Sequence, residues 1–126
     1  MALGRAIEVN EAYRILKDPV RRAEALLRQR GVQTGEGKEP PASPALLMDV
    51  MERREALADV RKTKSEAALR RLIGEVRTEA DRAQAALGTE FALPEPNPAE
   101  ILKRVGELRY YRRFLEEAAS IADDLF

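Results

Sequence analysis

The stretch from Ala45 to Asp59, ALLMDVMERREALAD, gathers the side chains best suited to bind another molecule. Three large apolar residues, Leu47, Met48 and Met51, lie there among carboxylates. The 126-residue chain contains no cysteine and no histidine, which excludes thiol chemistry, disulfides and the usual zinc and cysteine-ligated iron–sulfur sites. The commonest general base is therefore missing, and no nucleophile–base pair or phosphate-binding loop is visible. We expect a binding protein, not an enzyme, without cofactor or metal.

Charge and hydropathy narrow the class of partner. Lys and Arg together number 22, as do Asp and Glu, whereas a nucleic-acid-binding domain usually has a basic excess. Arginine pairs such as Arg53-Arg54 and Arg112-Arg113 are interleaved with acids, and we interpret them as solvated helix faces. No apolar run reaches the ~18 residues of a membrane span, and the first residues lack the pattern of a secretion signal. We expect a cytoplasmic protein that binds neither nucleic acid nor membrane.

Apolar residues recur every three or four positions through most of the chain, which predicts helices. A first helix is expected over 3–16, and a second from Pro19, capped by Asp18, to Gly31. The sequence GVQTGEGKEPPASP that follows has no periodicity and is rich in Gly and Pro, so it is expected to be a linker. The predicted organisation is a helical hairpin over 1–30, a linker over 31–43 and a three-helix unit over 44–126.

The three-helix unit opens with a helix from Pro44, capped by Ser43, to about Val60. Thr63 and Glu66 then have the spacing of a capping box, which predicts the start of the next helix.

The second of these helices is expected to end at Gly88, and the third to run from Asn97 nearly to Phe126. Their apolar stripes are too wide to stay in water, so we expect an all-α fold in which the three helices close as an antiparallel bundle. The stripes are Leu69, Leu72, Ile73, Val76, Ala80, Ala83 and Leu87, and then Ile101, Val105, Leu108, Tyr111, Leu115, Ala118, Ala122 and Leu125.

The helix over 44–60 has apolar residues on two faces. At about 100° per residue, one side carries the residues that the other helices can cover: Leu46, Val50, Leu57 and Val60. The remaining surface carries Leu47, Met48, Met51, Glu52, Glu55 and Asp59. Either the bundle or the N-terminal hairpin buries this second face, or it is a partner site in which Met and Leu supply adaptable contacts and the carboxylates select a basic partner. The pattern alone leaves both interpretations open.

Three segments resemble HscB, the J-type co-chaperone of iron–sulfur cluster assembly: VNEAYRILKDPVRRAEALL over 9–27, LLMDVMERREAL over 46–57 and LRYYRRFLEEA over 108–118. They occur in the order expected for that family and extend over nearly the whole chain. The P-x-x-R-A-E-x-L-L and L-M-x-x-x-E-x-R-E elements together are fairly specific.

The resemblance implies a J-domain, which stimulates the ATPase of an HscA/DnaK-type chaperone, joined to a three-helix domain that binds an IscU-type scaffold protein. Relative to the family pattern, Met51 replaces Leu, Asp59 replaces Glu and Tyr110 replaces Phe. The scaffold-binding residues implied by the resemblance are Leu47, Met48, Met51, Glu52, Glu55, Asp59 and Tyr110.

The resemblance fails at the His-Pro-Asp loop through which a J-domain works, because the chain has no histidine. Residues 1–30 resemble only the end of a J-domain, and we favour a truncated reading frame over a fragment or a degenerate homologue. A chaperone partner is expected only if a complete J-domain exists. Without its partners the hairpin is expected to fray around Tyr13 and Leu16. The rival interpretation is a self-associating helical protein, with a weak homodimer through Met48 and Met51.

Overall fold

The structure, a computed structural model, describes residues 18–35 and 40–126. Within these ranges the fold is all-α, as the sequence predicts, and the helices are α2 (Pro19–Gln29), α3 (Pro44–Thr63), α4 (Glu66–Phe91) and α5 (Pro98–Leu125). The helix expected over 3–16 lies outside the described residues. In the described part of the chain, no helix combines the length and apolar character needed to cross a membrane.

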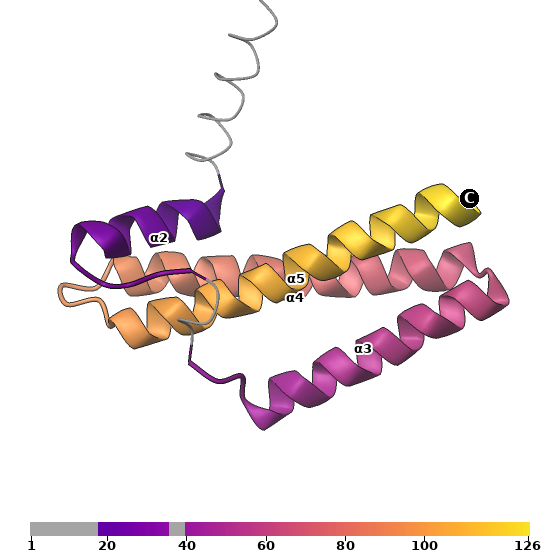
Figure 1. Ribbon diagram of the computed structural model, residues 1–126, viewed down its shortest axis with the longest axis horizontal. Coiled ribbons are helices and arrows are strands. Elements are labelled where there is room, and N and C mark those ends of the chain that lie inside the picture. Colours follow the sequence, from indigo (N-terminus) through magenta and orange to yellow (C-terminus); the bar gives the residue numbers. More distant parts are fainter. Residues whose placement is uncertain (1–17, 36–39) are drawn as a thin grey trace, which may run out of the picture.

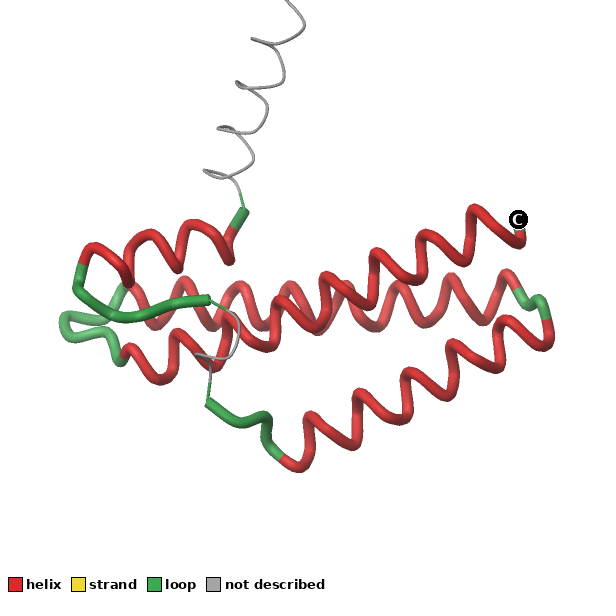
Figure 2. The backbone as a smooth tube through the Cα atoms, in the orientation of Figure 1, coloured by secondary structure: helices red, strands yellow, loops and turns green. Residues whose placement is uncertain are grey.

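The helices α4 and α5 pack along one another in antiparallel directions (Figure 1). A short turn joins α3 to α4, and α3 diverges from the α4–α5 pair toward its own N-terminal end (Figure 2). On the other side of the pair, α2 lies against the half that is close to the α4–α5 connection. Both α2 and α3 therefore pack against the α4–α5 pair.

Capping side chains begin α2, α3 and α5 where the sequence predicts. Asp18, Ser43 and Asn97 each accept a hydrogen bond from a backbone N–H of the following turn, at 2.9, 3.2 and 3.0 Å. Proline follows each cap, at the first helical position, where a backbone N–H would have no partner within the helix. The predicted stop of α2 at Gly31 is also confirmed, since its φ of 79° lies in the left-handed region that favours glycine.

The predicted capping box at Thr63 is wrong. Thr63 is the last residue of α3, and its hydroxyl donates to the Asp59 carbonyl at 2.8 Å. Lys64 then takes the left-handed conformation, with φ 53° and ψ 41°, and Ser65 caps α4 by accepting the Ala68 N–H at 3.2 Å. The sequence offers two hydroxyl residues within one turn, and only Ser65 follows the residue that turns the chain.

The predicted end of α4 at Gly88 is wrong as well, because α4 continues to Phe91. The Phe91 side chain packs partly buried against the core. This contact offsets the low helix propensity of glycine.

The predicted stripes of α4 and α5 form the hydrophobic core. Phe114 and Ile121, which the prediction omits, are buried, whereas Leu115 and Ala122 are only partly buried. Because α5 contacts α2, α3 and α4, its covered arc is wider than a single stripe. The buried stripe residues are Leu69, Val76, Ala83 and Leu87 of α4 and Ile101, Val105, Leu108, Tyr111 and Ala118 of α5.

The helix α2 belongs to the same core. Its buried residues Val20, Ala23 and Leu27 pack in one cluster with those of α4 and α5. The division of the chain at 31–43 into separate units therefore stays a prediction, while the packing itself is continuous from α2 to the bundle.

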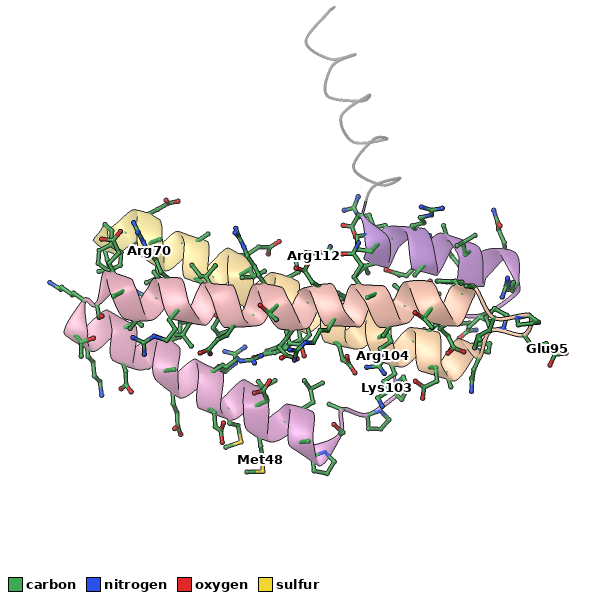
Figure 3. The ribbon with its side chains drawn as sticks, turned by 180° about the vertical axis from the view of Figure 1, so that it is seen from behind. Met48, Arg70, Glu95, Lys103, Arg104 and Arg112 are labelled. Carbon is green, nitrogen blue, oxygen red and sulfur yellow. The ribbon has the colours of Figure 1, made fainter. Side chains whose placement is uncertain are left out.

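Two ion pairs join α5 to α2 and its capping residue. The Arg112 guanidinium of α5 donates to Asp18 Oδ1 at 2.7 Å, so the residue that caps α2 also ties it to α5. One turn earlier on α5, Arg109 pairs with Glu24 at 2.7 Å, with both side chains largely buried. Figure 3 shows Arg112 beside α2. These contacts fix which part of α5 lies under α2.

Because α2 shares one core with the bundle, shortening a buried side chain of α2 should destabilise the whole fold. Leu27 is fully buried, so Leu27→Ala should lower the free energy of unfolding by about 2–5 kcal/mol, measured by urea denaturation. Leu93→Ala is the matched control, because Leu93 is 46% exposed, and its effect should stay below about 1 kcal/mol. Equal effects of the two variants would contradict the continuity of the core.

Candidate partner-binding surface

The two apolar faces of α3 have opposite environments. Toward the bundle, Leu57 and Val60 are buried and Leu46 and Val50 are partly buried. On the other side, the exposed fractions are 52% for Leu47, 63% for Met48 and 64% for Met51. The described helices therefore cover the first face and leave the second uncovered. Figure 3 shows Met48 projecting from α3 away from the other helices.

Carboxylates share this uncovered side. Helical rotation places Glu52, Glu55 and Asp59 beside the three apolar residues, and all three are exposed. In the described part of the chain no salt bridge engages these carboxylates. Among the residues that the structure describes, no group of three or more His, Cys, Asp or Glu side chains lies where it could hold a metal ion. The six residues that form what we call the outer face are Leu47, Met48, Met51, Glu52, Glu55 and Asp59.

Tyr110, the seventh predicted site residue, is not part of the outer face. It lies on α5, partly buried, with its ring centroid 5.3 Å from that of Tyr111. Together with Leu46 and Val50 it lines a groove of about 370 Å³ between α5 and the N-terminal half of α3. Leu46 and Val50 are on the covered side of α3, so α3 separates Tyr110 from the exposed methionines.

The Tyr110 hydroxyl is buried beside charged side chains of α3. Its oxygen is buried, and no group in the described residues makes a well-formed hydrogen bond with it. Burial raises the pKa of Tyr110 above its ordinary value of 10.0, and the neighbouring Arg53 guanidinium lowers that pKa in part. Burial also raises the pKa of Tyr111, and the Glu107 carboxylate acts in the same direction. Both phenols are therefore held in the neutral form.

Arg53 is not the solvated residue that the sequence predicts. Its side chain is only 13% exposed, and it forms an ion pair with Asp49 at 2.9 Å. The guanidinium carbon lies 6.0 Å from the centroid of the Tyr111 ring, so the cation of α3 faces an aromatic ring of α5. The position of Arg53 in the helical rotation, between Leu46 and Val60, was a signal that could have placed it on the covered side.

The comparisons with known proteins point to one family. The model of the HSCB C-terminal oligomerisation domain matches residues 42–119, which include α3, α4 and most of α5. The "Co-chaperone protein HscB homolog" of Burkholderia multivorans is 40% identical over 89 residues, which are 71% of this chain and 51% of that protein. The protein of the same name from Burkholderia mallei is 41% identical over 88 residues, covering 70% and 50%.

The chain belongs to the HscB family, through the C-terminal domain of that family. It spans about half the length of the curated relatives that it matches. No solved structure matches it.

The raised pKa of Tyr110 predicts a loss of stability in alkali. The folded state holds the phenol neutral, whereas the unfolded chain ionises it at about 10.0. This contribution is therefore complete below pH 10.0 and is lost as the pH rises through that value toward the folded pKa. Urea denaturation at a series of pH values should show the loss.

Tyr110→Phe is the control for the alkaline titration of the other groups. Its free energy of unfolding should fall less steeply above pH 10.0 than that of the parent protein. Parallel curves for the two proteins would contradict the assignment to Tyr110.

Proposed function

We propose that this chain is the scaffold-binding part of a co-chaperone in iron–sulfur cluster assembly, and that it binds an IscU-type scaffold protein on the outer face of α3. The observation that carries the proposal is the exposure of Leu47, Met48 and Met51 on one side of a helix whose other side is buried. Family membership and the co-chaperone names of the relatives support it. The action is binding, with no covalent chemistry on this chain.

The two kinds of residue on the outer face have different tasks in this proposal. The apolar side chains lose water on contact and supply most of the affinity, as buried anchors do at protein interfaces. The carboxylates Glu52, Glu55 and Asp59 remain at the edge of the contact and favour a basic partner, acting on the rate of association and on specificity. The expected partner surface is thus apolar at its centre and basic around it.

Tyr110 would act from the groove. Since α3 separates it from the outer face, a scaffold contacts both only by reaching past the N-terminal end of α3 into the space that Leu46 and Val50 line. The chain contains no histidine, and the J-domain loop that stimulates an HscA/DnaK-type chaperone requires one. We therefore assign only scaffold binding to these 126 residues.

The test is a titration of a purified IscU-type scaffold by calorimetry. Each anchor truncated to Ala should cost roughly 1–2 kcal/mol of binding free energy, so the Leu47/Met48/Met51 triple Ala variant should bind far more weakly than the parent. Leu93→Ala is the matched control, since Leu93 is also exposed but lies in the α4–α5 connection. Equal affinities of the triple variant and the parent, at equal helicity, would refute the site.

Self-association is the second candidate function, and the description of the matching family model as an oligomerisation domain favours it. In this case the exposed methionines would form the contact between two copies. Light scattering over a concentration series should then show a dimer that the Met48→Glu/Met51→Glu variant abolishes. A parent protein that stays monomeric throughout the series would exclude it.

A further inference from the structure

The attachment of α3 to the bundle is uneven along its length. Its C-terminal half buries Leu57 and Val60, and the turn at Lys64 joins it directly to α4. Its N-terminal half buries no residue completely, and the groove of about 370 Å³ separates it from α5. The exposed apolar residues of the outer face all belong to this less firmly packed half.

Arg53 lies where the two halves meet. It follows Asp49, its ion-pair partner at 2.9 Å, by one turn, and it precedes the buried Leu57 by one turn. Its guanidinium faces the Tyr111 ring at 6.0 Å. Tyr111 is itself a core residue, 6% exposed. Arg53 therefore contacts the core between the buried Leu57 and the N-terminal half of α3 that lies across the groove.

A cation in this position is costly. A charge taken out of water loses hydration, and its ion pair repays that loss only in part, so apolar replacements of similar size are often neutral or stabilising. The contact has a different property that apolar packing lacks. A guanidinium paired with a carboxylate and facing an aromatic ring keeps both contacts in few orientations, whereas apolar side chains tolerate small rotations of a helix.

We infer that Arg53 is a positioning residue for the outer face: its contact with Tyr111 of α5 fixes the rotation and tilt of the N-terminal half of α3, and so the direction in which Leu47, Met48 and Met51 point. The ion pair with Asp49, on the same helix, orients the guanidinium for that contact. The inference rests on the proposed scaffold binding for its consequence, but the orientation of α3 is a property of the free protein. Stability and recognition are then separable at this residue.

The structural test measures the orientation of α3 directly. The chain has no native cysteine, so Ala45→Cys on α3 and Ala119→Cys on α5, both exposed, can carry a pair of spin labels. Electron–electron resonance should give one narrow distance distribution in the parent. Arg53→Met, which removes the charge but keeps an unbranched side chain, should shift or broaden that distribution. Arg54→Met is the matched control at an exposed neighbouring position and should leave it unchanged.

The same variants are compared for stability and binding. Arg53→Met should melt at the same temperature as the parent or higher, yet bind an IscU-type scaffold roughly tenfold more weakly. Arg54→Met should not lower the affinity while leaving the melting temperature unchanged or higher. A residue that only stabilised the fold would lower melting temperature and affinity together. If Arg53→Met does not fold, Arg53→Lys carries the test, since it keeps the charge but loses the planar group that faces Tyr111.

The outcomes distinguish the inference from the proposed function. An unchanged distance distribution in Arg53→Met, or in Arg53→Lys where that variant carries the test, overturns the positioning role whatever the scaffold does. A changed distribution with undiminished binding also overturns it. If the distribution changes but the parent itself binds no scaffold, the proposed function fails and the control of α3 orientation by Arg53 stands.

Discussion

The helix α3 has two apolar faces, and the structure depends on which of them packs against the other described helices. The face with Leu57 and Val60 is buried against the α4–α5 pair, and the face with Met48 and Met51 is left outside. The exposed residues are methionine and leucine, whose side chains adapt to varied contacts. The position of α3 on the bundle therefore decides what the outer face presents.

The run LRYYRR in α5 serves two neighbours at once. Arg109 and Arg112 pair with α2, whereas Tyr110 and Tyr111 point to the side of α3, where Tyr111 meets Arg53. Adjacent residues differ by about 100° around a helix, so six consecutive positions suffice to reach both sides. The central part of α5 thus links the placement of α2 to that of α3.

Sequence reasoning succeeds here where a local rule decides the outcome. Asp18, Ser43 and Asn97 act as caps whatever the rest of the chain does, and the apolar stripes of α4 and α5 follow from helical spacing. It fails where two local signals compete, as at Thr63 and Ser65, and where a distant contact decides, as at Phe91. Arg53 shows how local signals can disagree: an arginine among acids is typical of a solvated face, whereas its helical rotation places it on the covered side. The contact with the Tyr111 ring, far along the chain, is what no local pattern could predict.

The residues of the outer face also differ from the rest of α3 in what a substitution there would disturb. None of them belongs to the hydrophobic core, and none is needed to cap or connect a helix. A change at Met48 or Glu55 should therefore leave the folding of the chain nearly untouched and, under the proposed function, act on recognition alone. Such a surface can diverge in step with a partner over evolutionary time, while the bundle beneath it stays the same.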